Sequence, residues 1–160
     1  MDGFRIGIGV DIHRLGRGGP LRLGGIDIPH EKSAIGHSDG DVLIHAVVDA
    51  LLGAAALGDV GQMFPDTDPA NKGRDSAEML TAACEAIATV GLKVSNIDCV
   101  VLAERPKILP HRQTIRERLA EILGIEPESV WIKGKTGERV GPIGQEEAIE
   151  AQCVALLVPR

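Results

Sequence analysis

The most informative part of this chain is its first apolar stretch, Arg5-Ile6-Gly7-Ile8-Gly9-Val10-Asp11-Ile12-His13. Its isoleucines and valine occupy every second position, a period of two that predicts a β-strand with one apolar face. Successive side chains of a strand point to opposite faces, so Asp11 and His13 share the other face with Gly7 and Gly9. Because glycine carries no side chain, we expect room there for a ligand to approach the backbone.

The apolar run Val42–Leu57 predicts a helix that ends at Gly58. Asp41, His45 and Asp49 follow one another at four-residue intervals and form one polar stripe on that helix. An apolar helix has no need of a histidine at this position unless the imidazole binds something. A metal ligand, supported by nearby carboxylates as hydrogen-bond partners, explains the stripe.

Asp11, His13 and His45 together suit a zinc ion, since one carboxylate and two imidazoles leave a fourth tetrahedral position open for substrate. The alternative is purely structural. In that case Asp11 and His13 are the polar face of a half-buried strand, and His45 is a hydrogen-bonded histidine of the core. The polar stripe around His45 favours the metal site.

The start of the same helix carries a second polar signal. Ser38 and Asp41 have the spacing of a capping box, with Asp in place of the usual Glu or Gln. His37 lies just before the helix, where free backbone N–H groups favour anions such as phosphate. The alternative is that His37 and Ser38 only cap the helix.

Composition limits the possible functions. The chain has 160 residues, of which 44% are hydrophobic, enough for one domain over residues 1–160 with a single core. A net charge of −6 argues against binding to nucleic acid or to an anionic membrane surface. The sequence also lacks a membrane-length apolar stretch and a secretion signal at Met1–Arg5. Cys84, Cys99 and Cys153 fit buried small hydrophobes in a reducing compartment, so we expect a cytoplasmic protein.

Strands and helices alternate along the rest of the chain without a linker. The expected elements are a hairpin over Leu21–Ile28 about a Gly24-Gly25 turn, a helix from Ser76 to Gly91, a strand over Ile97–Ala103, a helix from Pro110 to Gly124, a strand over Val130–Lys133 and, from an apolar run that also fits a helix, a strand over Ala148–Val158. Helices between strands imply crossover connections and parallel pairing, and hence an α/β sandwich.

Two loops are candidate pocket walls. The loop Gly58–Pro69 contains Phe64, one of only two phenylalanines, among Gly, Pro and Asp residues. A core role is usual for Phe, but this setting favours a lid or the wall of a pocket. The segment Ala103–Pro110 follows a strand, where ligands of open α/β sheets bind. A rigid turn bracketed by prolines explains that segment equally well.

Several short motifs carry a family resemblance. They are Gly9–His13, Leu23–Gly25, Gly36–Asp41, Asp49–Ala54, Leu57–Gly61, Phe64–Pro69, Asn96–Asp98 and Arg105–Lys107. Together they resemble the 2-C-methyl-D-erythritol 2,4-cyclodiphosphate synthase (MECDP synthase) family over essentially the whole chain. The resemblance is most specific up to about Pro110 and weaker in the last thirty residues.

This resemblance implies a lyase of the non-mevalonate (MEP) route of isoprenoid and terpenoid biosynthesis. The substrate would be 4-diphosphocytidyl-2-C-methyl-D-erythritol 2-phosphate, converted to the 2,4-cyclodiphosphate and CMP by metal-assisted intramolecular phosphoryl transfer. The implied fold is α/β (α+β), a single-domain two-layer sandwich with βαβ crossovers and a mixed sheet covered by helices on one face. The implied assembly is a homotrimer whose sheets face the trimer axis and whose active sites lie between subunits.

The resemblance also assigns site residues. It places one Zn²⁺ per subunit on Asp11, His13 and His45, and a Mg²⁺ or Mn²⁺ that bridges the substrate diphosphate on Glu138. It credits His37 and Thr136 with stabilising the transition state. Substrate contacts fall on Asp11, Ile12, His13, His37, Ser38, Asp59, Val60, Gly61, Phe64, Pro65, Asp66, Thr67 and Asp68, and, for the cytidine and diphosphate, on Ala103, Glu104, Arg105, Pro106, Lys107, Ile108, Leu109, Lys135, Thr136, Gly137 and Glu138.

The chain departs from the family pattern in two places. Lys133-Gly134-Lys135-Thr136-Gly137-Glu138 stands where the family usually has Lys-Ala-Thr-Thr-Thr-Glu, and Gln145 replaces an arginine associated with anion binding on the trimer axis. The sequence is therefore consistent with three functions: an active synthase, a catalytically impaired trimer kept for binding or scaffolding, and a generic zinc phosphohydrolase. The metal triad and Glu138 favour the first. The sequence offers no second carboxylate-histidine set for a two-zinc hydrolase.

Overall fold

The computed structural model describes residues 3–160. Its strands are β1 (Arg5–Arg17), β2 (Leu21–Leu23), β3 (Ile26–Ile28), β4 (Lys32–Ile35), β5 (Leu92–Leu102), β6 (Val130–Lys135) and β7 (Ala148–Pro159). Its helices are α1 (Val42–Ala55), α2 (Val60–Met63), α3 (Ser76–Thr89), α4 (Arg112–Leu123) and α5 (Gly141–Gly144), with 3-10 turns at Pro69–Asn71, Leu109–His111 and Pro127–Ser129. The expected hairpin and the final strand are confirmed, β1, β5 and β6 extend beyond their expected bounds, and β4 has no counterpart among the expected elements.

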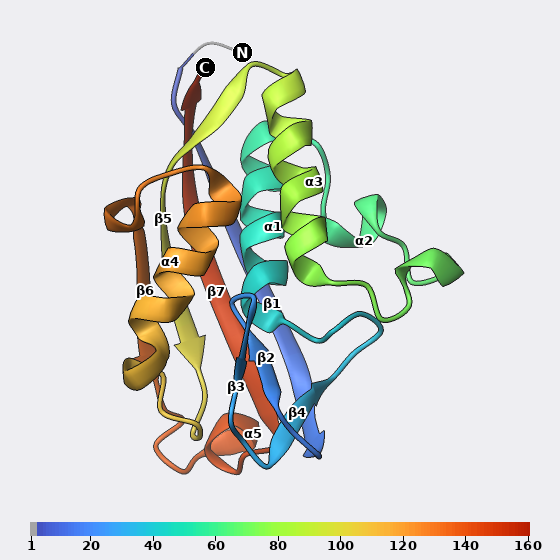
Figure 1. The fold of residues 1–160 in the computed structure, drawn as a ribbon, viewed down its shortest axis with the longest axis vertical. Helices are drawn as coiled ribbons and strands as arrows, with labels where there is room; N and C mark the ends of the chain where they lie inside the picture. The colour runs from blue at the N-terminus through green and yellow to red at the C-terminus, as the bar shows by residue number, and fades with distance from the viewer. Residues whose placement is uncertain (1–2) are drawn as a thin grey trace.

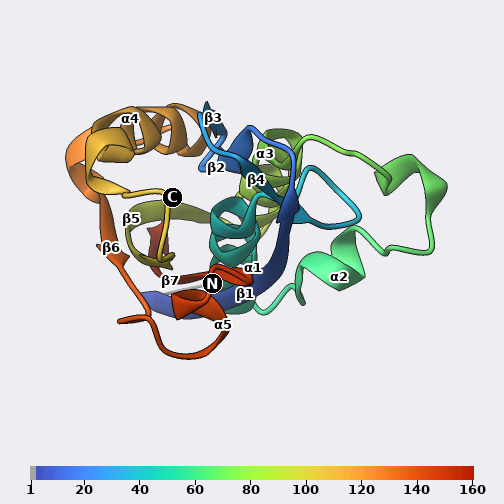
Figure 2. The ribbon, with the colours of Figure 1, turned by 90° about the horizontal axis from the view of Figure 1, so that it is seen from below.

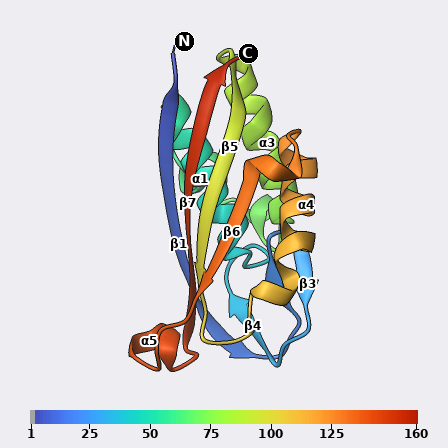
Figure 3. The same ribbon diagram turned by 90° about the vertical axis from the view of Figure 1, so that its left-hand side faces the viewer.

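The fold has two layers. Five strands form one mixed sheet in the order β4-β1-β7-β5-β6, and β2 pairs with β3 in a separate hairpin. Helices α1, α3 and α4 lie on one face of the sheet, while on the other face the described residues place only α5, at one end (Figure 3). Figure 2 shows the same two layers from below. The predicted mixed sheet with helices on one face is confirmed.

The expectation of general parallel pairing is wrong. Within residues 3–160, only β5 and β6, which α4 connects, form a parallel pair, whereas β1–β4, β1–β7 and β5–β7 are antiparallel. Both β1 and β5 run antiparallel to β7, so they are parallel to each other, as a helical crossover requires. They are not neighbours because the last strand of the chain, β7, inserts between them.

Helix α1 forms the centre of the core. It lies between the sheet and α3, and of its residues only Asp49 and Gly53 are not buried (Figure 1). Gly7 and Gly9 explain how it packs so closely on β1. A Cβ atom at Gly7 would collide with the carbonyl oxygen of Ala50, and one at Gly9 with that of Ala46. The glycines therefore admit a helix, and the expectation that they admit a ligand is wrong.

The alternate residues of β1 stay uncovered in the single chain. Ile6, Ile8, Val10 and Ile12 are between 51% and 73% exposed. They line up on the face of the sheet opposite α1, where apolar side chains have no helix to pack against. A row of this kind on a sheet face is typical of a protein–protein interface.

Two expectations from composition concern the whole chain. Within residues 3–160, none of the helices combines the length and the apolar character needed to cross a membrane. Cys99 and Cys153 are buried, as expected, and Cys84 is half-buried. Burial raises the pKa of the Cys84 thiol to about 11, which leaves it un-ionised at neutral pH.

Candidate metal centre and substrate pockets

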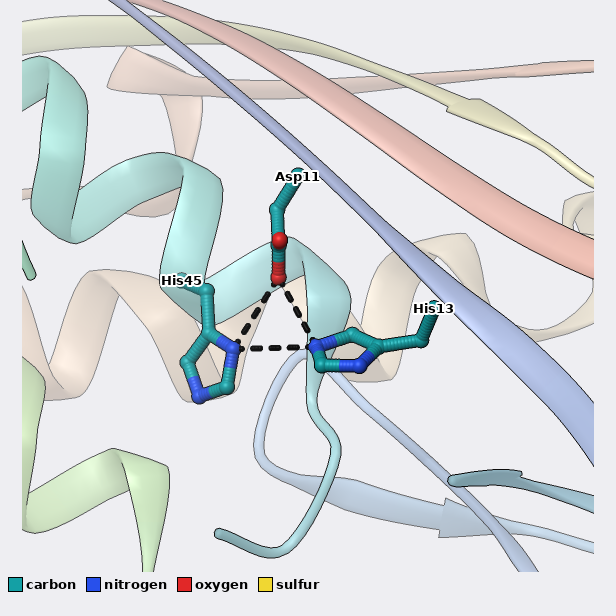
Figure 4. Close-up of side chains that lie close together, drawn as sticks. All are labelled: Asp11, His13 and His45. Atoms are coloured by element: carbon teal, nitrogen blue, oxygen red, sulfur yellow. Dashed lines mark hydrogen bonds and ion pairs between the residues drawn. The ribbon is translucent and has the colours of Figure 1, made fainter. Parts of the chain in front are cut away.

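The three predicted metal ligands converge on one point (Figure 4). Asp11 and His13 extend from β1 and His45 extends from the first turn of α1. The Oδ2 atom of Asp11 lies 2.9 Å from His13 Nε2 and 3.0 Å from His45 Nδ1. The two imidazole nitrogens are 3.2 Å apart. The close packing of α1 on Gly9 is what brings His45 within reach of the strand.

This donor set fits a single tetrahedral metal ion. Metal–ligand bonds of about 2.0–2.1 Å place neighbouring ligand atoms about 3.3 Å apart, close to the separations observed. Three protein ligands also leave the fourth position open toward the adjoining hollow, as in catalytic zinc sites. Among residues 3–160, Asp11, His13 and His45 are the one group of three or more such side chains with this spacing.

The electrostatics of the triad favour a cation. Burial alone would raise the pKa of Asp11, but hydrogen bonds to His13 and His45 outweigh it and lower the pKa to about 2. The hydrogen bond to Asp11 raises the pKa of His13 above its usual value, although burial acts in the opposite direction. A permanent carboxylate charge therefore sits between two imidazoles, which a divalent ion would balance.

The supporting partners of His45 differ from those expected. Its Nε2 atom lies 3.0 Å from Ser38 Oγ and 2.9 Å from Ser76 Oγ, so hydroxyl groups rather than carboxylates hold the ring. Asp49 instead accepts a hydrogen bond from the backbone N–H of Val60. Sequence reasoning missed Ser76, because its one local signal is a helix start that lies thirty-one residues from His45.

The predicted capping box is also wrong. Asp41 is itself the N-cap of α1 and accepts from the backbone N–H of Ile44. Its carboxylate also accepts from the N–H groups of Gly24 and Gly25, and it is fully buried. Asp41 therefore ties the β2–β3 hairpin to the start of the helix, and Ser38 is left to contact His45.

A hollow of about 200 Å³ opens beside the triad, and we call it the metal pocket. Its lining residues are Asp11, His13, His37, Ser38, His45, Val60, Gly61, Phe64, Asp66, Asn71 and Met79. His37 is one of these residues, and its Nε2 atom is buried without a hydrogen-bond partner among the described residues. An orphaned ring nitrogen of this kind is available to a bound ligand.

Phe64 forms part of the wall of the metal pocket. It is only 7% exposed, and the guanidinium group of Arg74 stacks 4.8 Å from its ring centre. The rest of the predicted loop is more open. Pro65, Thr67 and Asp68 are exposed, Asp68 caps the following turn, and Asp59 caps α2.

A second hollow, which we call the loop pocket, lies at the end of β5 and β6. It measures about 120 Å³ and is lined by Ala103, Lys107, Ile108, Leu109, Arg112, Gly134, Lys135 and Thr136. Glu138 follows closely, and its backbone N–H donates to Thr136 Oγ at 3.3 Å. Glu104, Arg105 and Pro106 line a neighbouring open hollow of about 590 Å³, and Lys107 lines both hollows.

The segment after Lys133, which departs from the family pattern, is tightly packed. A Cβ atom at Gly134 would lie 2.9 Å from Ile108 Cβ, and one at Gly137 would collide with the backbone of Gly144. The glycines therefore allow this stretch to fold closely on its neighbours. Gln145 donates to the carbonyl oxygen of Arg139 at 2.8 Å and holds the same loop.

The predicted site residues do not all meet within one chain. Residues at the start of α1 and in α2 line the metal pocket, whereas residues of β6 and α4 line the loop pocket. Helix α2 lies on one side of the molecule, and β6 and α4 lie on the other (Figures 1 and 2). His37 therefore lines one hollow and Thr136 lines the other. Ile12 lines neither, since its side chain points to the uncovered face of the sheet.

Comparison with known proteins agrees with this geometry. A family model described as the YgbB family matches residues 4–158. The chain is 54% identical over 155 residues to the 2-C-methyl-D-erythritol 2,4-cyclodiphosphate synthase of Gemmatimonas aurantiaca, covering 97% of this chain and 93% of the relative. It is 53% identical to the enzyme of the same name from a Nostoc species, covering 97% and 94%.

Solved structures give the same result. The CDP complex of IspF from Plasmodium falciparum superimposes with a TM-score of 0.88 at 36% sequence identity, and the match covers 100% of this chain and 99% of that one. The fold, the near-complete coverage and the high identity all agree. The chain belongs to the YgbB family, in which its relatives are 2-C-methyl-D-erythritol 2,4-cyclodiphosphate synthases.

Proposed function

We propose that this protein converts 4-diphosphocytidyl-2-C-methyl-D-erythritol 2-phosphate to 2-C-methyl-D-erythritol 2,4-cyclodiphosphate and CMP. The observation that carries the proposal is the metal triad at the mouth of a pocket whose buried His37 nitrogen lacks a partner among the described residues. The relatives that bear this name match almost the full chain.

The reaction needs little covalent help from the protein. The 2-phosphate oxygen attacks the inner phosphorus of the substrate's own diphosphate, a P–O bond forms there, and the bond to the CMP oxygen breaks. Positioning and charge stabilisation then account for most of the catalysis. His37 lines the metal pocket, and its imidazole donates a hydrogen bond to a phosphate oxygen, while the Thr136 hydroxyl group does the same from the loop pocket.

The binding residues divide between the two pockets. Phe64, Gly61 and Asp66 enclose the methylerythritol part in the metal pocket. The backbone and side chains of Ala103–Leu109 hold the cytidine, and Lys107 and Lys135 face the diphosphate from the loop pocket.

Two metal sites belong to the proposal. Asp11, His13 and His45 would hold Zn²⁺, and Glu138 would contribute to a site for Mg²⁺ or Mn²⁺ together with diphosphate oxygens. When bound, such ions neutralise phosphate charge and align the reacting groups. Carboxylate oxygens are the ligands that Mg²⁺ and Mn²⁺ prefer, which suits the exposed Glu138.

We also propose a homotrimer with active sites between subunits. Two observations support it: His37 and Thr136 lie in separate pockets of one chain, and Ile6, Ile8, Val10 and Ile12 form an uncovered apolar row. A head-to-tail ring would bury the row and bring the metal pocket of one subunit to the loop pocket of the next. The expected cytoplasmic location stays a prediction.

The activity is tested by incubating purified, zinc-loaded protein with the cytidyl substrate and Mg²⁺. Release of CMP together with the cyclic diphosphate, identified by ³¹P NMR, is the expected result. An open-chain phosphate product would indicate a hydrolase instead. No turnover despite bound zinc would indicate a protein kept for binding or scaffolding.

The assembly is tested with Ile8→Asp, which puts a charge in the centre of the apolar row. We expect the variant to lose the trimer and most of its activity, because charged groups are excluded from the core of an interface. Sedimentation velocity measures the assembly. Thr81→Asp, on the exposed side of α3, is the control and should leave the trimer intact. An Ile8→Asp protein that sediments as wild type would contradict the proposed interface.

A further inference from the structure

The second ring nitrogen of His45 has a structured environment of its own. Nδ1 faces Asp11 and the centre of the triad, while Nε2 faces Ser76 Oγ at 2.9 Å and Ser38 Oγ at 3.0 Å. A neutral imidazole carries its hydrogen on one nitrogen and a lone pair on the other. For Nδ1 to bind a metal through its lone pair, Nε2 must carry the hydrogen and donate it to one of the two hydroxyl groups.

Ser76 is the better acceptor of that hydrogen. It is fully buried at the first position of α3, and its hydroxyl group donates to Asp39 Oδ1. Its backbone N–H donates to the other oxygen of the same carboxylate at 2.9 Å. A carboxylate only accepts, so the hydroxyl hydrogen of Ser76 points to Asp39 and its lone pairs are left for His45 Nε2.

The hydroxyl hydrogen of Ser38 has no partner that fixes its direction in the same way. Its Oγ accepts only a long contact from the backbone N–H of Gly40, at 3.5 Å, and it lines the metal pocket. Its hydroxyl hydrogen can therefore turn toward a ligand in the pocket. The two serines are close to the same nitrogen but are set up for different partners.

We infer that Ser76, oriented by Asp39, is a positioning residue that accepts the Nε2 hydrogen of His45 and thereby fixes Nδ1 as the metal-binding nitrogen. The inference rests on the metal site of the proposed function. The hydroxyl group holds both the tautomer and the angle of the ring, as outer partners of metal-binding histidines do. Asp39, which precedes the N-cap of α1, and Ser76, the first residue of α3, supply this arrangement.

The same pair links the metal ligand to the segment before α3. Asp39 N–H donates to the carbonyl oxygen of Arg74 at 3.2 Å, and Gly73 N–H donates to that of His37 at 2.9 Å. Arg74 in turn stacks on Phe64 of the pocket wall. Hydrogen bonds and one cation–π contact thus connect the pocket wall to His45.

The test measures zinc affinity by competition with a chromogenic chelator, with zinc alone as the probe. Ser76→Ala should weaken zinc binding about 10–100-fold, the usual effect of losing an outer partner of a metal ligand. Ser76→Thr keeps the hydroxyl group and should recover most of that loss. Ser38→Ala removes the other hydroxyl group beside His45 Nε2 and is the comparison: it should weaken zinc binding less than Ser76→Ala does.

A spectroscopic readout separates positioning from general damage to the fold. In zinc-loaded wild-type protein labelled with ¹⁵N-histidine, the Nε2–H signal of His45 should be protected from exchange with water, and Ser76→Ala should remove that protection. Asp39→Asn keeps the Ser76 hydroxyl group but disturbs the direction of its hydrogen, so it should weaken zinc binding by a smaller factor than Ser76→Ala. It provides a second variant if Ser76→Ala does not fold.

The outcomes are distinct. Wild-type zinc affinity in Ser76→Ala, or a larger loss in Ser38→Ala than in Ser76→Ala, would overturn the inference and leave the proposed function standing. A wild-type protein that binds no zinc would instead overturn the metal site of the proposed function.

Discussion

The metal pocket and the loop pocket are built in different ways. The metal pocket takes its three ligands from the middle of a strand and the first turn of a buried helix, locked together at Gly9 and Ala46. The loop pocket takes its residues from the segments that follow β5 and β6. All three ligands of the metal pocket meet within one chain, whereas Thr136 of the loop pocket lies apart from them.

The largest expected effect falls on the metal pocket. His45→Ala removes one of the three ligands, so bound zinc should disappear and turnover should fall by about 10³-fold or more, given the several kcal/mol that a metal contributes to phosphoryl transfer. Zinc analysis and CMP release measure both effects. The thermal unfolding curve should stay cooperative, because the substitution leaves the apolar contacts of α1 in place. Full activity without His45 would rule out the metal assignment.

Mixing two inactive variants tests whether the pockets belong to different subunits. His45→Ala disables the metal pocket and Glu138→Gln disables the second metal site. In a ring of three, every mixed trimer then contains one intact site, so equal mixing with subunit exchange should restore about a quarter of wild-type activity. The control is each variant carried through the same exchange alone. If the mixture stays inactive, both residues serve the same subunit's site and the contrast between the pockets fails.

A pair of glycine substitutions measures how tightly the metal pocket is locked. Gly9→Ala puts a Cβ atom against the carbonyl oxygen of Ala46 and should cost about 1–3 kcal/mol of unfolding free energy, with weaker zinc binding because His45 moves. Gly53→Ala, on the exposed side of the same helix with open space around it, should instead stabilise the protein by about 0.5–1 kcal/mol. Urea unfolding of both variants gives the comparison. Equal effects would show that the close packing on β1 is not what holds α1.

The smallest effect is a pH dependence confined to the metal pocket. Zinc binds the deprotonated imidazole of His13, and the hydrogen bond to Asp11 raises the pKa of that imidazole. Because the pKa is raised, protons compete with zinc for His13 at a higher pH than for an ordinary histidine. As the pH is lowered, zinc affinity should therefore begin to decrease before pH 6.5 is reached, and at lower pH it should decrease by up to about tenfold per pH unit. Asp11, with a pKa of about 2, stays ionised over this range. A zinc affinity that is flat between pH 8 and 6 would contradict this account.

The sequence was a good guide where local periodicity and motif coincide. The period of two in β1 and the apolar run of α1 predict both elements. The polar residues within these apolar patterns, Asp11, His13 and His45, predict which side chains form the candidate metal site. Strand order was not predictable in the same way, because the position of β7 between β1 and β5 depends on pairing across the whole chain. Neither was Ser76, since only the packing of α3 on α1 brings a buried hydroxyl group to His45.

The glycines of β1 also bear on how this strand can change over evolutionary time. At positions 7 and 9 the backbone of α1 excludes any side chain, whereas at positions 6, 8, 10 and 12 the side chains are more than half exposed in the single chain. Substitutions in the first set act within one molecule and appear as loss of folding. In the proposed trimer, substitutions in the second set would act mainly where subunits meet and would change the fold of a single subunit much less. Alternate positions of β1 are therefore expected to evolve under two different constraints, one from the packing of α1 and one from contacts between subunits.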